Sequence, residues 1–403
     1  MRKYLKYLKG DKVIWVITLI LLSFSLVSVY SFVPILVKME GGTPFKYLFK
    51  HFIYVLISFS AMFWIHKRNP VYFGKLAKLA FYASIGMLIF TFFFGKNVNG
   101  AGRWIQVPFV GLTFQASDFA KLALLLYIAK LLEKKKDVLK SWKDGFWPIM
   151  VPIIVICGLI VKDNFSTAAI VFMICLIVLF LGNVPLLKIF SLIGGGILLF
   201  CFVILAHKTL PDLNLLPRYQ TWENRILSRF EMKPEVTDAV AVVDNAQAKN
   251  AELGIYNGGF LGQGPGNGKV KEYVPEAYAD FFYASYIEEF GLIGGILLTG
   301  MYLILLYRIF SIALKADKLF ETYAALGIGI LLLSQAVVNM MVCTGIFPVT
   351  GQNMPLLAMG GSALIMTCVA IGIVQSIASK QMPDKEETAT GKVNAEGTNE
   401  YSV

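Results

Sequence analysis

The chain has 403 residues, of which 57% are hydrophobic and 16% are charged. Soluble globular proteins carry about 45–50% apolar and about 25% charged residues, so the composition excludes an ordinary soluble domain. The formal net charge of +11 does not indicate nucleic-acid binding here, because Lys and Arg cluster beside apolar blocks, as the positive-inside rule expects of a membrane protein.

Apolar blocks divide the chain into candidate membrane-spanning segments. A helix needs about 20 apolar residues to cross a bilayer, and lipid-facing backbone must satisfy its own hydrogen bonds, so each block is expected to be helical. We therefore predict an all-α polytopic membrane protein with about ten transmembrane helices and both termini in the cytoplasm. The predicted spans cover residues 13–37, 51–66, 72–94, 117–132, 147–161, 165–182, 186–206, 280–307, 321–343 and 355–379.

The segments around the spans define the domain organisation. Residues 1–12 are basic and are expected to stay in the cytoplasm, ahead of a transmembrane domain over residues 13–379. The longest link, about 207–279, then falls outside as one large extracytoplasmic loop, whose weakly structured middle, 230–260, has no assigned role. Residues 380–403 are polar and are predicted to form a disordered cytoplasmic tail. The scattered histidines and the lack of a C-x-x-C pair indicate no histidine metal cluster and no disulfide framework.

The outer link before the fourth span carries charges that the positive-inside rule does not explain. Arg103 lies in this link, and Gln115, Ser117, Asp118 and Lys121 follow at the start of the span. On a helix, Ser117 and Lys121 lie one turn apart, and Asp118 is three residues from Lys121. Such basic groups at the outer face predict either ion pairs within the bundle or binding of a phosphate group.

A glycine-rich run closes the large loop. Repeated glycine permits positive φ and a close approach of the backbone to a ligand. A nucleotide-binding P-loop is excluded, because Gln263 stands where its first glycine is needed and Val270 replaces its Ser or Thr. The run is therefore either a flexible loop or a place where backbone amides and Lys269 hold a phosphate. Its glycines are Gly262, Gly264, Gly266 and Gly268.

The junction between this loop and the eighth span carries carboxylates. Pro275 suits the first turn of a helix, and Glu276 and Asp280 are four residues apart and so share a helix face. Asp280 lies at the mouth of an apolar span, where ionisable groups are costly and usually functional. The alternative is a helix-start carboxylate stabilised by the helix dipole. Glu288 lies two turns deeper in the same span, which argues against a simple lipid-facing helix.

Prolines and glycines interrupt the apolar sequence before the last span. Pro348 and Gly351 precede the pair Gly360-Gly361. Broken helices at membrane depth are tolerated where they line a cavity, and paired glycines also allow close helix packing. Either reading explains the pattern.

Together these segments resemble the SEDS family of cell-wall glycan polymerases, the relatives of FtsW and RodA. The order, the spacing and the number of predicted spans agree, and the resemblance covers nearly the whole chain except the tail. The segments that carry it are Arg103-Trp104-Ile105, Gln115 to Lys121, Gly262 to Gly268, Val274 to Asp280, Glu288 to Gly291, Pro348 to Gly351 and Gly360 to Ser362.

The chain departs from the family pattern at several positions. Ala116 replaces a proline and Asp118 replaces a glutamate. The family's Gln-Pro-Asp-x-Gly-Thr-Ala stretch is changed at residues 162–166, so no role is carried over to them, and Leu357-Ala-Met replaces a Phe-Ile-Ser-Tyr-like run. The Asn-Phe-Ser-Thr and Thr-Gly-Gln variants favour an FtsW-type member, with a division role, over a RodA-type member with an elongation role.

The resemblance implies a function. The family polymerises lipid II, an undecaprenyl-pyrophosphate-linked disaccharide-pentapeptide, at the outer face of the cytoplasmic membrane. Asp280 matches the family's essential aspartate and is the expected general base of an inverting transfer, which needs no second carboxylate as nucleophile. Arg103, Lys121 and Lys269 are expected to bind the substrate pyrophosphate, with Gln115 and Ser117 beside them. Glu276 is expected to orient the acceptor or, with Asp280, to hold Mg²⁺ or Mn²⁺; no organic cofactor is expected.

Two other functions remain open on the sequence. A lipid II flippase also fits buried charges and broken helices, and a non-catalytic scaffold of the division complex fits a membrane bundle without a second domain. The expected partners are a cognate class B penicillin-binding protein of the FtsI type, which supplies a transpeptidase, and other division-complex membrane proteins. No nucleic-acid partner is expected.

Overall fold

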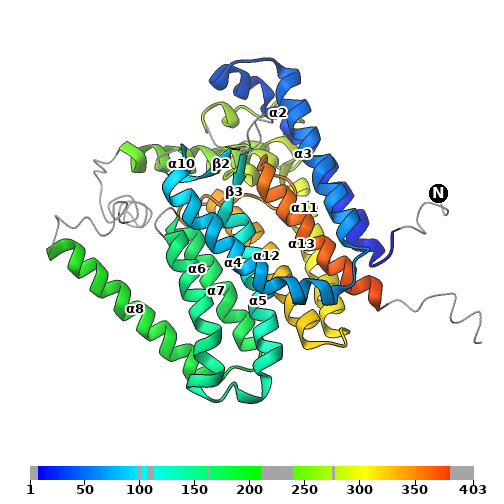
Figure 1. Ribbon diagram of the computed structural model, residues 1–403. Coiled ribbons are helices and arrows are strands. Elements are labelled where there is room, and N and C mark those ends of the chain that lie inside the picture. Colours follow the sequence, from blue (N-terminus) through cyan, green and yellow to red (C-terminus); the bar gives the residue numbers. More distant parts are fainter. Residues whose placement is uncertain are drawn as a thin grey trace, which may run out of the picture.

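The computed structural model describes residues 8–98, 101–106, 113–161, 164–209, 223, 239–274 and 277–381. Its long helices pack side by side into a bundle, and Figure 1 shows their order around it. Each of the ten predicted spans overlaps one of these helices, which confirms a polytopic helical membrane protein. The helices are α2 (Lys12–Glu40), α3 (Pro44–Ile65), α4 (Pro70–Phe94), α5 (Ala116–Lys135), α6 (Trp147–Val161), α7 (Phe165–Leu181), α8 (Leu186–Thr209), α11 (Phe282–Leu314), α12 (Leu319–Cys343) and α13 (Gly361–Lys380).

The lengths and compositions of these helices bear on the number of membrane crossings. Within the part of the chain that the structure describes, eight helices are long and apolar enough to span a membrane, and α7, with 17 residues, falls just short. The remaining helix, α5, carries charged side chains at both ends, including Asp118, Lys121, Lys134 and Lys135. The count of ten spans therefore stays a prediction.

The start of α2 and the end of α13 lie on the same face of the helical bundle. Asp11 caps α2 by accepting hydrogen bonds from Val13 N and Ile14 N, and its carboxylate also pairs with Arg308 near the end of α11. The Gln375 amide of α13 exchanges two hydrogen bonds of 2.8 Å with the backbone of Asp11. Figure 1 accordingly shows the red end of α13 beside the blue start of α2. An even number of crossings requires this arrangement; that the face is cytoplasmic stays a prediction.

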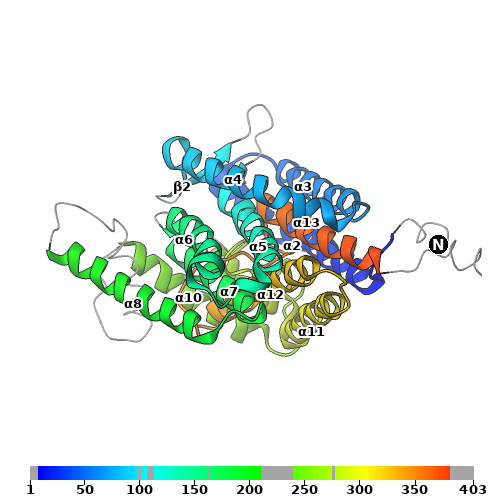
Figure 2. The same cartoon turned by 60° about the horizontal axis from the view of Figure 1, so that its bottom comes forward.

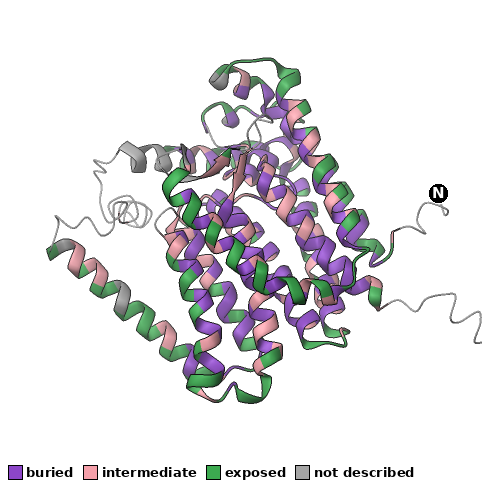
Figure 3. Ribbon diagram, viewed as in Figure 1, coloured by how far each residue is buried: buried purple, intermediate pink, exposed green. Residues whose placement is uncertain are grey.

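Helix α8 starts beside α7 and diverges from the rest of the bundle in Figure 1, and in the turned view of Figure 2 it lies at one edge of the molecule. Only 6% of its most apolar window is buried, against 67% for α12 and 78% for α13. The colours of Figure 3 show the same contrast between α8 and the buried helices at the centre. The core that positions polar groups is therefore built from α5, α12 and α13 with their neighbours, and α8 contributes little to it.

The outer link after α4 contains a small sheet that the sequence did not predict. Its antiparallel strands are β1 (Lys96–Val98), β2 (Ala101–Gln106) and β3 (Thr113–Gln115). In the register of β2 and β3, Trp104 lies opposite Gln115, and β3 runs directly into α5. The sheet therefore brings the Arg103 segment against the start of α5, although the two are separate in the sequence.

The large loop is not unstructured in its middle. Residues Ala239–Gly258 form the helix α10, which Figure 1 shows lying across the end of the bundle. The expectation of a weakly structured middle over 230–260 is therefore wrong for these residues. The apolar stretches within α10 are too short to be recognised as a span. The helix is stabilised instead by packing of Ala251 and its neighbours against α11.

Two predicted spans also differ in detail. The eighth was predicted as one continuous helix, but α11 breaks at Gly291, whose φ is 69° and ψ −176°. The last was predicted to begin at residue 355, but α13 begins at Gly361 because residues 344–360 form a loop in which Leu356 has a φ of 65°. The average hydrophobicity of each span does not locate either feature, although Glu288 and Glu289 lie just before the break and the polar residues Thr350, Gln352 and Asn353 lie in the loop.

Candidate active site

The break in α11 creates backbone groups that need partners. Carbonyl groups before the break lose the amides that would lie four residues ahead, and amides after it lose the carbonyls behind. The glycine-rich run and the residues just before it supply both sets. Gln263 N and Gly264 N donate to the carbonyls of Glu288 and Glu289, each at 2.9 Å, whereas Gly259 O and Phe260 O accept from Leu292 N and Ile293 N at 2.9 and 3.3 Å. Residues 259–264 thus form a splice, which supplies the hydrogen-bonding partners that the broken helix lacks.

This splice explains why two positions are occupied by glycine. A Cβ at Gly262 would lie 2.3 Å from Glu289 O, and a Cβ at Gly291 would lie 2.4 Å from Gly262 N. Both residues also have positive φ, 81° and 69°. The amides of Gln263 and Gly264 already bind carbonyl groups, so they do not form the phosphate cradle that repeated glycine suggested. Gly264 and Gly266 share the positive φ of the run, at 94° and 84°.

Buried charges hold the end of the run in place. The Lys271 ammonium is 2.8 Å from the Glu289 carboxylate, both side chains are 5% exposed, and the hydroxyl of Ser31 on α2 bonds to both. One residue earlier, Glu288 is fully buried and its Oε1 accepts a hydrogen bond of 3.0 Å from Lys269 N. The side chain of Lys269 itself is exposed. Glu288 therefore contributes to the structure of the junction, which ties α2, α11 and the glycine-rich run together.

Asp280 lies directly before α11 and is half-buried. A Cβ at Gly351, which has a φ of 70°, would lie 3.4 Å from Asp280 Oδ2 and 3.8 Å from Asn164 Nδ2. The carboxylate therefore sits against the loop that contains Pro348 and Gly351, close to the residue that caps α7. Three segments that are far apart in the sequence meet at this carboxylate.

Residues that the sequence analysis did not select hold these segments together. Asn339 on α12 donates from Nδ2 to Asp280 O at 2.9 Å and to Gln352 O at 2.8 Å. Gln352 Nε2 donates to Thr167 Oγ1 on α7 at 2.7 Å, and Thr167 N donates to Asn164 Oδ1 at 3.0 Å. Asn339, Gln352 and Thr167 are all at least 96% buried. The sequence signal that could have identified Asn339 is an amide side chain near the end of an apolar helix, because an amide is costly to bury unless it is hydrogen-bonded.

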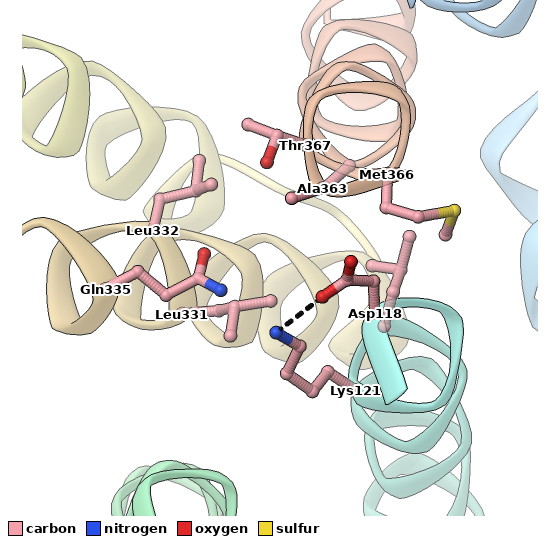
Figure 4. Close-up of a pocket in the computed structure, with 10 residues that line it drawn as sticks. Asp118, Lys121, Leu331, Leu332, Gln335, Ala363, Met366 and Thr367 are labelled. Carbon is pink, nitrogen blue, oxygen red and sulfur yellow. Dashed lines mark ion pairs between the residues drawn. The ribbon is translucent and has the colours of Figure 1, made fainter. Parts of the chain in front are cut away.

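Lys121 lies deeper in the bundle, between α5, α12 and α13. Its Nζ is 2.9 Å from Asp118 Oδ1, and the hydroxyl of Ser362 donates to Asp118 Oδ2 at 2.9 Å. Figure 4 shows this pair beside the side chains of Gln335 and Thr367, around a cavity of about 20 Å³. A cavity of that size holds a single water molecule. Lys121 therefore forms an ion pair within the bundle, with Asp118, whereas binding of a phosphate group by Lys121 stays a prediction.

The remaining predicted residues are placed as follows. Gln115 Nε2 donates to Ser117 Oγ at 2.9 Å, so these two side chains bind each other at the start of α5. Arg103 lies in β2, opposite this segment, but its side chain is outside the described residues, as are Pro275 and Glu276. Gly360 and Gly361 begin α13, and a Cβ on Gly361 would lie 2.2 Å from the ring of Tyr54, so packing requires glycine there.

The described residues offer few ligands for a metal ion. They contain no group of three or more His, Cys, Asp or Glu side chains placed to hold one. Mg²⁺ is nevertheless commonly bound by one or two carboxylates together with substrate phosphates, rather than by a complete protein cage. Asp280 fits that kind of partial site, and Glu276 is the second carboxylate near it in the sequence.

Comparison with known proteins places this chain among relatives of similar length. The family model for the cell cycle proteins FtsW, RodA and SpoVE matches residues 11–382. A probable peptidoglycan glycosyltransferase FtsW from Coxiella burnetii is 32% identical over 379 residues, which is 90% of this chain and 95% of that protein. A protein with the same description from Geobacter sp. strain M18 is 31% identical over 382 residues, covering 92% and 97%.

Solved structures share the fold. A chain of a peptidoglycan synthase complex superimposes with a TM-score of 0.70 and 24% identity, covering 93% of this chain and 99% of that one. The crystal structure of the Thermus thermophilus rod shape determining protein RodA gives 0.64 and 22%, covering 93% and 98%. At these identities the likeness concerns the fold alone.

Proposed function

The chain belongs to the FtsW/RodA/SpoVE family of multi-pass membrane proteins, and from that membership together with the position of Asp280 we propose that it is a peptidoglycan glycosyltransferase. Its substrate is lipid II, which it polymerises into glycan strands at the outer face of the cytoplasmic membrane. The observation that carries the proposal is a half-buried carboxylate at the meeting point of the starts of α7 and α11 and the loop at Gly351.

Asp280 is the general base in this proposal. The 4-hydroxyl of the acceptor GlcNAc transfers its proton to the Asp280 carboxylate while its oxygen bonds to the anomeric carbon of the lipid-linked MurNAc. The bond from that carbon to the pyrophosphate breaks on the opposite side, so the anomeric centre inverts. Only one carboxylate is needed, because no covalent glycosyl-enzyme intermediate forms.

The leaving pyrophosphate needs positive charge nearby. We assign this role to Arg103, Lys121 and Lys269, with Gln115 and Ser117 as hydrogen-bonding neighbours at the start of α5. Proximity supports this assignment for Arg103 and for the start of α5, because the sheet pairs the Arg103 strand with the strand that leads into α5. We also propose that apolar grooves between the helices would take the polyprenyl chains.

Asp280, with Glu276, would hold a divalent cation, either Mg²⁺ or Mn²⁺, which when bound neutralises charge on the pyrophosphate. We expect a chelator such as EDTA to abolish polymerisation by the purified protein. Readdition of Mg²⁺ or Mn²⁺ should restore it, and readdition of Na⁺ at equal ionic strength serves as the control. Full activity in excess EDTA would remove the cation from the proposal.

The proposed setting is cell division, because the curated relatives named above are FtsW proteins. The proposed partner is a class B penicillin-binding protein of the FtsI type, together with other membrane proteins of the division complex. An elongation role of the RodA kind predicts instead a partner from the elongation machinery, and copurification of the chain with each candidate separates the two.

Polymerisation of lipid II by the purified chain tests the proposal. The protein is reconstituted in liposomes with its cognate class B penicillin-binding protein and fluorescent lipid II, and products are separated by gel electrophoresis. The transpeptidase site of the partner is inactivated for this assay. We expect the chain to produce glycan strands under this condition. Lipid translocation without polymer would indicate a flippase, and neither activity with intact complex assembly would leave a scaffold.

A further inference from the structure

Asn339 occupies a position from which it controls the geometry around Asp280. It lies in the last turn of α12 and is fully buried. It lies outside the segments that resemble the family pattern. Its amide joins the junction before α11 to the loop after α12, which are also joined by a hydrogen bond of 3.0 Å from Met359 N to Tyr278 O.

Both polar atoms of the Asn339 amide, Nδ2 and Oδ1, form hydrogen bonds at this junction. Both Nδ2 bonds, to Asp280 O and Gln352 O, go to backbone carbonyl groups, which only accept. Oδ1 accepts from Tyr283 N at 3.4 Å. These partners fix the orientation of the amide, because the flipped group would oppose two carbonyls with an oxygen. A carboxylate of the same size could not replace it for the same reason.

The contacts extend from Asn339 to a second helix. Gln352, whose carbonyl binds Asn339, uses its side chain to bind Thr167 on α7. Thr167 in turn binds the capping side chain of Asn164, which lies beside Gly351 and the Asp280 carboxylate. The hydrogen bonds therefore run around the carboxylate from α12, through the Gly351–Gln352 loop, to the start of α7.

We propose that Asn339 is a positioning residue for Asp280, acting through the backbone of residues 280–283 and through Gln352. It fixes the Asp280 carboxylate relative to Gly351 and Asn164, so that the base meets the acceptor hydroxyl in the correct direction. This inference rests on the proposed glycosyltransferase function. General bases must lie within hydrogen-bonding reach of the proton they accept, and small displacements of such groups reduce rates strongly.

Kinetics of Asn339→Ala test the proposal. We expect kcat for lipid II polymerisation to fall by about 10- to 100-fold, with KM for lipid II changed by less than about threefold, because Asn339 does not touch substrate. Ser334→Ala is the matched control, since Ser334 lies on the same helix and its hydroxyl bonds only the carbonyl of Ile330, at 2.6 Å. It should behave as wild type. Wild-type kcat in Asn339→Ala would overturn the proposal.

A double-mutant cycle separates positioning from general loosening of the fold. Thr167→Val keeps the side-chain shape but removes the acceptor of Gln352 Nε2. If Asn339 and Thr167 act through the same loop, the fold-losses in kcat of the two variants will not multiply in the double variant. Multiplicative losses would show independent effects and contradict the proposal. Should Asn339→Ala fail to fold, Thr167→Val alone decides, since it must lower kcat without changing KM.

Hydrogen exchange provides a readout that does not depend on activity. In Asn339→Ala the amide of Tyr283 loses its acceptor, so its exchange should accelerate by about tenfold or more relative to wild type, while amides in α4 stay unchanged. If wild type makes no polymer, the proposed function fails but this measurement still tests the positioning. Unchanged exchange over residues 280–283 would overturn it.

Discussion

Replacing Asp280 by Asn is expected to reduce lipid II polymerisation by at least about 100-fold, because general base catalysis typically contributes 10²–10⁴-fold. Asparagine has nearly the same shape but accepts no proton at this position. The backbone contacts of Asp280, including the bond from Asn339 to its carbonyl, do not depend on the carboxylate. The loss should therefore appear in kcat without loss of folded protein, and Asp280→Ala should behave in the same way.

The control for this substitution is Asp137→Asn, since Asp137 is exposed in the link after α5, at the opposite end of that helix from the site. It should retain wild-type activity. Both proteins are purified with the partner penicillin-binding protein, checked for monodispersity and thermal stability, and assayed with the same lipid II preparation. Polymer at the wild-type rate from Asp280→Asn would refute the assignment of Asp280 as the base.

The second large effect is expected from Gly291→Ala, at the break in α11. Its Cβ would lie 2.4 Å from both Gly262 N and Phe260 O, and its φ of 69° is unfavourable for any residue with a Cβ. Positive φ costs about 1–2 kcal/mol and overpacking costs about 1–3 kcal/mol, so the free energy of unfolding should fall by about 2–5 kcal/mol. Gly262→Ala should have a similar effect, because it closes the same contact from the other side.

Gly86→Ala is the matched control for these two variants. Gly86 lies within α4, and a Cβ there would meet no atom within 4 Å. Alanine is favoured over glycine in a helix by up to about 1 kcal/mol, so this variant should be as stable as wild type or slightly more so. Thermal unfolding in detergent, followed by tryptophan fluorescence, measures all three. Equal midpoints for Gly291→Ala and Gly86→Ala would contradict the splice as a determinant of stability.

The transmembrane helices could be located from the sequence because the signal for each is local. Transfer to lipid depends on the hydrophobicity of about 20 consecutive residues, and long apolar stretches are continuous in the chain. The segment 147–161 was predicted with the bounds that α6 has in the structure. The three-residue spacing of Asp118 and Lys121 on a helix permits the ion pair that they form, but the sequence left that ion pair open against phosphate binding.

The glycine-rich run is the clearest case of information that is not local. From the sequence it was either a flexible loop or a phosphate site, since glycine serves both. The deciding groups are the carbonyls of Glu288 and Glu289, more than twenty residues away, which lack partners because α11 breaks. A broken helix in an apolar environment must have its free backbone groups satisfied from elsewhere, and this requirement is visible only once the break is known.

The same distinction applies to the candidate site. The position of Asp280 at the entrance of an apolar helix follows from the order of charged and apolar residues along the chain. Its surroundings follow from packing, since the bond between Gln352 and Thr167 joins residues 185 positions apart and that between Asn339 and Asp280 joins residues 59 apart. Buried amides acquire their roles from partners brought together by packing, and sequence spacing carries no record of those partners.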